Sequence, residues 1–407
     1  MAIATTHDPA DPSREVIKAF AILGVFFFLS TAGTYLYGLT GHAPYPRDGS
    51  TLVVGRDFLN FWMYGRAAVL PEPGQWYDAA VYQRELAALI GPGYPGQNWS
   101  YPPTIMLIAA PFGRLGYLSA LLVWTLAGFA IFLAVTTQQI ANRRALLALM
   151  VSPATVFCLI SGQSSLITAA MLIGIFAILD RRPLVAGVLI GLLTLKPQLG
   201  LLFPVVLIAA GRWRVFAAAS VTALMLAAAA TALYGTQAWI DFVTQGLPTQ
   251  NLVLNDPEGI GTPYYPTVFM NLRGIGLPYA IAMAVQACFA AAAVAAIAWA
   301  FSRRADADPR LMFALFAACS ISAVPYFLAY DTVALCYATL ALLAGGLLNA
   351  RGAWHARFVY WLPLLQIGLG TLHIPGPALI APAFALYIVL QLKQAGTVEA
   401  KRALSAA

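Results

Sequence analysis

Apolar runs long enough to form transmembrane helices recur along the whole chain, and no other feature limits the possible folds as strongly. Twelve such runs can be counted, at about residues 16–38, 104–137, 145–160, 165–179, 183–195, 198–210, 214–234, 278–301, 311–328, 331–349, 357–372 and 376–392. A helix needs about 20 apolar residues to cross a bilayer, so runs such as 183–195 are short. The pattern predicts an all-α integral membrane protein, a multi-spanning helical bundle of about 12 spans.

Composition supports this class and argues against others. Of the 407 residues, 60% are hydrophobic and only 10% are charged, whereas soluble domains carry about 25% charged residues. Long continuous runs favour helices over the short alternating strands of an outer-membrane barrel. The net charge of +7 comes from clusters between the runs, so it does not indicate a nucleic-acid partner. The cysteines fall inside apolar runs and are expected to be buried free thiols: Cys158, Cys288, Cys319 and Cys336.

The basic clusters predict how the chain is oriented in the membrane. If residues 1–15 form a cytoplasmic tail and the chain then crosses alternately, the clusters share the cytoplasmic side, as the positive-inside rule requires. These clusters are Arg143-Arg144, Arg181-Arg182, Arg212 with Arg214, Arg303-Arg304 with Arg310, Arg351 with Arg357, and Lys393 with Lys401-Arg402. We therefore expect one transmembrane domain over residues 16–394 in a bacterial inner membrane. Residues 395–407 then form a second cytoplasmic tail.

The same alternation places the polar residues that interrupt apolar surroundings on the extracytoplasmic side. That side receives a first long loop over residues 39–103, a second over 235–277, and the turn at 161–164. It also receives the Lys196-Pro197-Gln198 interruption. Broken helices in membranes usually line a cavity. We therefore expect two half-helices or a tilted pair of helices to meet at Lys196, beside an extracytoplasmic active site.

Asp57 is the candidate reactive carboxylate. It opens a predicted amphipathic helix in the first loop, and Asn60 and Tyr64 follow on the same helical face. A second surface helix is predicted in the stretch WYDAAVYQRELAALI. An acid at the start of an amphipathic helix, on the aqueous side of a membrane protein, is a functional candidate, and the alternative is that Asp57 only caps its helix.

Three further charged residues are candidates for substrate binding. Lys196 lies among leucines, where a charge is costly, and this makes it a functional candidate; the alternative is a lysine that snorkels to the interface. Arg273, near the end of the second loop, is the other candidate for binding a phosphate. Asp331 lies at the mouth of a predicted span, and its alternatives are an ion pair or a helix N-cap.

Several common catalytic motifs are absent from the sequence. It contains no Walker-type phosphate loop, dinucleotide fingerprint, HExxH or GxSxG. The four histidines, His7, His42, His355 and His373, are too dispersed to form a zinc site together. We therefore predict no metal and no cofactor, and a lipid-borne donor in place of a soluble nucleotide.

Four stretches, taken in order, resemble glycosyltransferase family 87 of the GT-C superfamily. That family includes mycobacterial polyprenol-phosphate-mannose-dependent mannosyltransferases. The stretches are RDFLNFWMYGRAA, the WYD that follows, YPPTIMLIAAPFGRL, and SGQSSLITAAMLIGIFAILDRRPLVAGVLIGLLTLKPQLGLLFPVVLI. The resemblance covers roughly residues 55–345.

The resemblance implies a GT-C-like fold whose first loop carries surface helices and the catalytic acid. It also implies inverting transfer of a hexosyl or pentosyl group from a polyprenyl-phosphate sugar to a hydroxyl of a glycolipid or glycan. Asp57 would be the general base, and Lys196 and Arg273 would hold the donor phosphate. Mycobacterial members look histidine-bearing at the turn where this chain has Tyr330-Asp331. The residues expected to contact the substrates are Asn60, Tyr64, Tyr101, Gln163, Gln198, Tyr265, Tyr330 and Asp331.

Two other functions stay open at this stage. A transporter or flippase for a polyprenyl-linked substrate would use Lys196 and Asp331 as coupling or binding charges. A ligase or polymerase of surface polysaccharide would share the polyprenyl substrate. Transporters usually carry internal repeats, and the sequence has no convincing one. Membrane lipids are the expected surroundings in every case.

Overall fold

The fold is helical throughout the part of the chain that the computed structural model describes, residues 12–406 without 96, 98, 256–261 and 305. Helices make up 77% of it, and these residues form no strand, only isolated bridges from Arg47 to Thr40 and Val53. The all-α class is therefore confirmed.

Some helices are long and cross the molecule, and the others are short and lie at bends and turns of the chain. The α-helices are α1 (Pro12–Tyr37), α2 (Arg56–Ala67), α3 (Ala79–Ile90), α4 (Ile105–Gly113), α5 (Tyr117–Gln139), α6 (Arg143–Met150), α7 (Pro153–Ser161), α8 (Ser165–Ile178), α9 (Pro183–Leu192), α10 (Pro197–Gly200), α11 (Phe203–Ala209), α12 (Trp213–Asp241), α13 (Leu247–Asn255), α14 (Val268–Gly274), α15 (Tyr279–Arg303), α16 (Pro309–Ser322), α17 (Val333–Ala344), α18 (Ala350–Thr371) and α19 (Ile380–Ala406). Between them lie the 3₁₀ turns η1 (Gln75–Tyr77), η2 (Leu193–Leu195), η4 (Thr262–Tyr264), η5 (Ala329–Thr332) and η6 (Gly376–Leu379), and the π-helical turn η3 (Phe242–Gly246).

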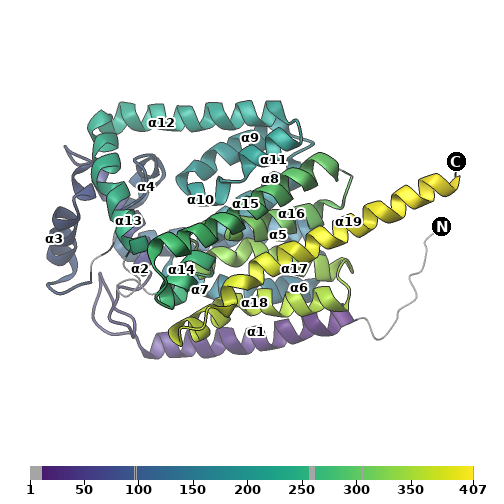
Figure 1. Cartoon of the computed structure of the whole chain (residues 1–407). Coiled ribbons are helices and arrows are strands. Elements are labelled where there is room, and N and C mark those ends of the chain that lie inside the picture. The colour runs from purple at the N-terminus through teal and green to yellow at the C-terminus, as the bar shows by residue number, and fades with distance from the viewer. Residues whose placement is uncertain (1–11, 96, 98, 256–261, 305, 407) are drawn as a thin grey trace.

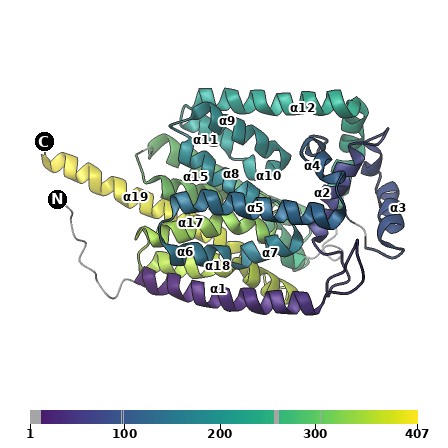
Figure 2. The same cartoon turned by 180° about the vertical axis from the view of Figure 1, so that it is seen from behind.

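The long helices run side by side, with α1 and α12 on opposite edges of the bundle (Figure 1). Helix α1 begins, and α19 ends, at one end of the molecule, whereas α2, α3 and α13 gather at the other end in both views (Figure 2). The ends of the described chain are thus separated from the helices of the first predicted loop by the length of the bundle.

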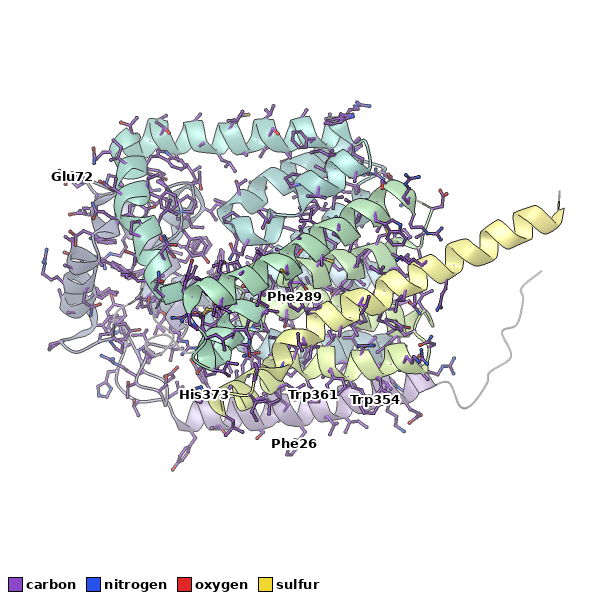
Figure 3. The ribbon with its side chains drawn as sticks, in the orientation of Figure 1. Phe26, Glu72, Phe289, Trp354, Trp361 and His373 are labelled. Atoms are coloured by element: carbon purple, nitrogen blue, oxygen red, sulfur yellow. The ribbon has the colours of Figure 1, made fainter. Side chains whose placement is uncertain are left out.

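Within the described part of the chain five helices are long and apolar enough to cross a membrane: Ser13–Tyr37, Tyr117–Gln139, Trp213–Thr249, Tyr279–Arg303 and Gly376–Ala395. A sixth span results if α6 and α7, bent by 42°, count as one. Five other apolar helices have only 10–17 residues, fewer than a full crossing needs. The expected number of about 12 spans is therefore not confirmed and stays a prediction. Large apolar side chains on the outside, such as Phe26 at 72% exposure, suit a lipid environment (Figure 3).

The predicted domain boundaries fall near helix ends but differ in detail. Helix α1 begins at Pro12, inside the expected tail over 1–15, and residues 1–11 of that tail lie outside the described residues. Gly235, at the predicted start of the second loop, breaks α12 with φ 80° and ψ 163°, and the bounds of that loop stay a prediction. Much of it is helical, however, in α13 and α14.

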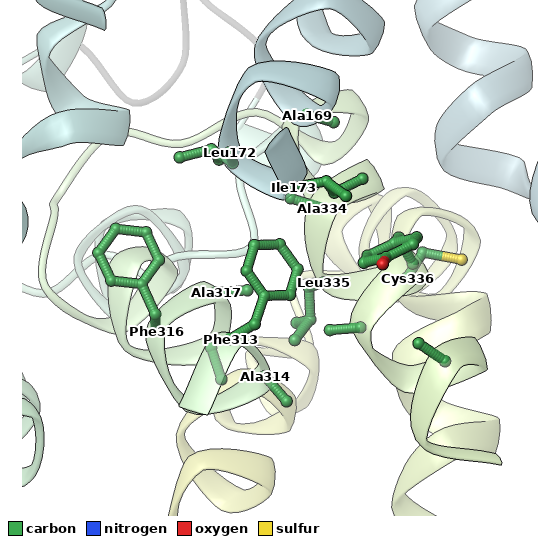
Figure 4. Close-up of a cluster of buried hydrophobic side chains, with 14 of the residues drawn as sticks. Ala169, Leu172, Ile173, Phe313, Ala314, Phe316, Ala317, Ala334, Leu335 and Cys336 are labelled. Atoms are coloured by element: carbon green, nitrogen blue, oxygen red, sulfur yellow. The ribbon is translucent and has the colours of Figure 1, made fainter. Parts of the chain in front are cut away.

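The main core lies between α8, α16 and α17 (Figure 4). Phe313 and Phe316 of α16 pack there with Leu335 of α17 and Ile173 of α8. The cysteines are all free, and three of them are buried. The prediction of burial is wrong for Cys288, which is exposed because its side of α15 faces away from this core.

Both helices predicted in the first loop are present, as α2 and α3, but α2 does not lie on the surface. Its residues Phe58, Leu59 and Met63 are buried. Trp99 packs against four aromatic side chains of the same loop, Tyr64, Trp76, Tyr77 and Tyr82. These rings form a second core that holds the loop together, because aromatic rings contribute large buried areas when they pack on one another.

The crossing of α2 and α4 depends on two facing glycines. A Cβ at Gly65 would lie 2.2 Å from the Ala109 carbonyl oxygen, and one at Gly113 would lie 2.1 Å from the Gly65 carbonyl carbon. We expect Gly65→Ala to lower the free energy of unfolding by about 1–3 kcal/mol, as overpacking does, measured by thermal unfolding in detergent. The matched control is Gly116→Ala, whose Cβ would meet no atom within 4 Å. Equal stability of the two variants would contradict this packing.

Candidate functional site

A cavity of about 620 Å³ lies between α2, the α7–α8 turn, the break at Lys196, η4 and η5. Polar side chains from segments far apart in the sequence line it. The predicted site residues among them are Asp57, Asn60, Tyr64, Tyr101, Gln163, Lys196, Gln198, Tyr265 and Tyr330. The structure therefore brings together most of the residues that the sequence analysis singled out.

Asp57 is positioned by the start of α2. The N-cap of that helix is Gly55, with φ 70° and ψ 40°, and Asp57 is the second helical residue. The alternative that Asp57 caps the helix is therefore wrong. Gly162 closes α7 in the left-handed region, and a Cβ there would lie 2.7 Å from Phe58 Cβ. The glycine thus lets the α7–α8 turn approach α2.

Burial acts on the pKa of Asp57 in one direction, and the surrounding hydrogen bonds and charges act in the other. Burial raises the pKa of its carboxyl, and the neighbouring Arg56 charge opposes that shift most strongly. Tyr330 and Gln163 form hydrogen bonds with the carboxylate, and Gln163 Nε2 also donates to Tyr330 Oη at 2.9 Å. The net pKa is raised, which suits a proton acceptor that works near neutral pH.

Lys196 lies at the predicted helix break. Helix α9 ends at Leu192 and the turn η2 at Leu195, Lys196 has φ −135° and ψ 72°, and α10 begins at Pro197. This confirms the interruption and its position beside a cavity. The side chain is only 4% exposed, so the alternative of a snorkelling lysine is wrong.

Lys196 forms a buried ion pair with Asp331. Lys196 Nζ lies 2.5 Å from Asp331 Oδ1, and Ser165 Oγ donates to the same oxygen at 2.6 Å. Asp331 Oδ2 is buried and has no hydrogen-bond partner among the described residues. Of the alternatives for Asp331, the ion pair is therefore confirmed. Lys196 lines the cavity, whereas Asp331 does not.

Arg273 does not line this cavity. Its guanidinium donates to the backbone carbonyls of Leu277 at 2.7 Å and Asn255 at 2.9 Å. The cation that lines the cavity with Lys196 is Arg56, whose guanidinium carbon lies 5.5 Å from the Tyr264 ring centroid. Arg56 was not among the residues predicted to bind the substrate. The signal for Arg56 in the sequence was its position directly before Asp57.

Asn60, Tyr64 and Tyr101, which are predicted to contact the substrates, also form hydrogen bonds within the protein. Tyr82 Oη donates to Asn60 Oδ1. The backbone N–H of Tyr101 donates to Tyr64 Oη at 2.8 Å. These bonds tie the cavity-lining face of α2 to the aromatic core of the first loop. The helix that carries Asp57 is therefore held on two sides.

Much of the remaining cavity wall is apolar, although Gln97, Ser100, Ser164 and Thr168 also line it. The apolar residues include Ile105, Ile108, Phe157, Ile167, Met171, Leu192, Leu193, Leu195, Leu328 and Ile367. The cavity thus combines charged and hydrogen-bonding groups with a long apolar surface. That combination fits a ligand that has a polar headgroup and a hydrocarbon chain.

The model of glycosyltransferase family 87 matches residues 99–325, more than half of the chain. The chain belongs to glycosyltransferase family 87. No curated protein matches it, and no solved structure does. The family 87 match includes Gln163, Lys196 and Tyr265 but begins after Asp57 and ends before Tyr330. The roles of these last two residues therefore rest on the geometry of the cavity.

Proposed function

We propose that this family 87 protein is an inverting glycosyltransferase that moves a sugar from a polyprenyl-phosphate donor to a hydroxyl of a glycolipid or glycan. The observation that carries the proposal is the cavity itself, where Asp57 lies with Arg56 and Lys196 beside an apolar wall. The cations suit the donor phosphate and the apolar wall suits the polyprenyl chain. We place the site at the outer face of the bacterial inner membrane, as the distribution of basic clusters predicts.

In the proposed reaction Asp57 takes the proton of the acceptor hydroxyl. The acceptor oxygen forms a bond to the anomeric carbon as the bond from that carbon to the phosphate oxygen breaks. The electron pair of the broken bond leaves with polyprenyl phosphate. Attack on the face opposite the phosphate inverts the anomeric centre. A positioned general base contributes about 10²–10⁴-fold to such a reaction.

Arg56 and Lys196 are proposed to stabilise the charge that develops on the departing phosphate. Fixed cations in a partly desolvated site are effective because they need little reorganisation during the reaction. Lys196 shares its charge with Asp331, so Arg56 is the cation of the two that has no such buried ion pair among the described residues. We propose Arg56, in place of Arg273, as the second phosphate ligand.

The reaction class is tested by transfer from radiolabelled synthetic polyprenyl-phosphate sugars to a membrane lipid extract, with purified protein in detergent. A labelled glycolipid product supports the proposal. If no donor yields product, the proposal fails, and movement of the same donors across vesicles containing the protein would then identify a flippase.

The pH dependence of transfer follows from the raised pKa of Asp57. A base acts only when deprotonated, so we expect activity to rise with pH through an acidic limb above the range of an ordinary carboxyl. Arg56→Gln removes the strongest charge that opposes this shift, so it should move the limb to still higher pH. Arg114→Gln, at an exposed residue outside the cavity, is the matched control. A limb that stays in place in Arg56→Gln would contradict Asp57 as the base.

Transfer is expected to persist in EDTA. Among the described residues no group of three or more His, Cys, Asp or Glu side chains is placed to hold a metal ion. The measurement compares initial transfer rates in EDTA, in added Mg²⁺ and in added Mn²⁺. A rate that falls in EDTA and returns with either cation would overturn the prediction.

A further inference from the structure

A second cavity, of about 470 Å³, shares the side chain of Arg56 with the first. Its walls come from the C-terminal half of α1, the turn at residues 48–50 and the end of α7. The polar part of its lining combines Arg56, Asp48 and several hydroxyl groups, and α1 and α7 supply apolar side chains. Asp57 is not among the residues that line it, so the proposed transfer reaction gives this cavity no role.

Arg56 brings a positive charge to the second cavity. Its guanidinium carbon lies 5.5 Å from the centroid of the Tyr264 ring, and with the described residues the guanidinium forms neither a hydrogen bond nor an ion pair. A guanidinium has five N–H donors in a planar fork that fits two oxygens of a phosphate. Arg56 therefore has enough unused donors for a ligand in each of the two cavities.

Asp48 brings a negative charge to the same cavity. Its Oδ1 accepts from Ser50 Oγ at 2.6 Å and from the backbone N–H groups of Ser50 and Leu52 at 2.9 and 3.3 Å. These bonds hold the carboxylate in place at the cavity wall. Its other oxygen, Oδ2, accepts no hydrogen bond from the part of the chain that the structure describes. This oxygen suits an ammonium group, because hydrogen bonds between two charged groups are strong.

The two charges line one cavity but do not pair with each other. No ion pair joins Arg56 and Asp48 among the described residues. Their charges nevertheless interact: burial acts to lower the pKa of the Arg56 guanidinium, and nearby acidic groups, Asp57 most strongly and Asp48 among them, raise it overall. A cation and an anion that face one cavity without pairing are complementary to a ligand that carries both charges.

Hydroxyl groups of α1 complete the polar lining. Ser30, Thr31 and Thr34 line the cavity, and the first and last of them lie one helical turn apart. Thr137 and Thr231 on other long helices donate their hydroxyls to the carbonyl four residues earlier. The three hydroxyls of α1 form no such bond within the described residues. They are therefore free to donate to the oxygens of a phosphate ester.

The cavity opens on the face of α1 that suits lipid. Helix α1 is a candidate membrane span, and Ser30 and Thr34 are exposed on it. Phe26 and Leu29 of the same helix are exposed as well (Figure 3). The cavity lies toward the end of α1 that leads into the first loop, where the headgroups of one leaflet would lie. A phospholipid can therefore place its headgroup in the cavity and its chains along α1.

We propose that the second cavity binds the zwitterionic headgroup of a membrane phospholipid, with the phosphate at Arg56 and the hydroxyls of α1 and with a primary ammonium at Asp48. The acyl chains lie on the exposed apolar face of α1. This lipid is neither the donor nor the acceptor of the transfer reaction, so the site does not rest on the proposed function. Phosphatidylethanolamine is the probe that carries both charges, and phosphatidylglycerol carries the phosphate alone.

The ligand class is tested by native mass spectrometry of the purified protein in detergent, titrated with the two lipids at equal chain length. We expect wild type to bind phosphatidylethanolamine about tenfold more tightly, because a hydrogen bond between charged groups contributes about that factor. Asp48→Asn keeps an acceptor for the turn at residues 48–50 but removes the charge, so it should abolish this preference. Asp180→Asn, at an exposed aspartate on another helix end, is the matched control. Equal binding of both lipids by wild type, or a preference that survives Asp48→Asn, would overturn the proposal.

The position of the site is tested with phosphatidylethanolamine that carries a diazirine close to its headgroup. The lipid is photolysed with the intact protein, and the labelled peptides are mapped. We expect labelling within residues 27–35 and 48–50, and its loss in Ser30→Trp, which fills the cavity. Leu29→Trp places the same side chain on a neighbouring exposed residue outside the cavity and is the matched control. Labelling elsewhere, or equal loss in the two variants, would overturn the site.

Soluble glycerophosphoethanolamine distinguishes a lipid from a free phosphate ester as the ligand. It carries the same two charges without acyl chains, so we expect it to compete with lipid labelling far more weakly than unlabelled phosphatidylethanolamine does. Equal competition would overturn the assignment to a lipid. Arg56 stays unchanged in every variant because it also lines the first cavity. Labelling needs no transfer, so it is expected even if no polyprenyl-phosphate sugar acts as a donor.

Discussion

Asp57→Asn is expected to reduce transfer by about 10²–10⁴-fold, because an amide cannot accept the proton of the attacking hydroxyl. The side chain keeps its shape, and Tyr330 can still donate a hydrogen bond to the remaining carbonyl oxygen. The fold and donor binding should therefore survive. The measurement compares initial transfer rates and donor KM for wild type and variant at matched protein concentration in detergent.

The control for this prediction is another aspartate replaced in the same way. Asp180→Asn removes an exposed ion pair with Arg212, and such pairs contribute little, so its rate should equal that of wild type. Full activity of Asp57→Asn would contradict Asp57 as the base. A transporter, in contrast, has no need of a base at residue 57.

Lys196→Ala is expected to lower the free energy of unfolding by about 3–5 kcal/mol, because it leaves the buried Asp331 without its cation. Transfer should fall by about 10²–10³-fold as well, if the same amine stabilises charge on the departing phosphate. The two effects are measured separately, by thermal unfolding in detergent and by transfer at a temperature where both proteins are folded.

The double variant Lys196→Met/Asp331→Asn separates these two roles. A buried ion pair replaced by neutral groups of similar size often costs no stability. We therefore expect the double variant to unfold near the wild-type temperature and yet to transfer as poorly as Lys196→Ala. Recovery of both stability and transfer would contradict a phosphate-binding role and leave Lys196 as a structural residue alone.

Local features of the site could be predicted from the sequence. The helical spacing of Asp57, Asn60 and Tyr64 placed them on one face, and all three line the cavity. The Lys196-Pro197 step predicted a helix break, because proline removes a backbone donor and restricts the residue before it. Such signals act within one or two turns of chain, so a single sequence carries them.

Contacts between distant segments were decided by tertiary packing. Asp331 lies 135 residues from Lys196 in the chain and Tyr330 lies 167 residues from Gln163, yet each pair is hydrogen-bonded. Composition and periodicity do not encode which helices become neighbours. Asp331 was therefore left with two structural alternatives until α8, η5 and the helix break were seen together.

Tertiary packing also decided between Arg56 and Arg273 as the proposed second phosphate ligand. Both are cations of predicted outer loops, and nothing in their local sequence separates them. Gly55 and Gly162 allow α2 and the α7–α8 turn to meet closely, and Arg56 at the start of α2 lines the cavity there. Backbone carbonyls hold Arg273 outside this cavity. Local sequence patterns predicted the helical class of the fold and the helical face that bears Asp57. The packing of the helices decided which charges surround it, because that depends on close approaches between segments far apart in the chain.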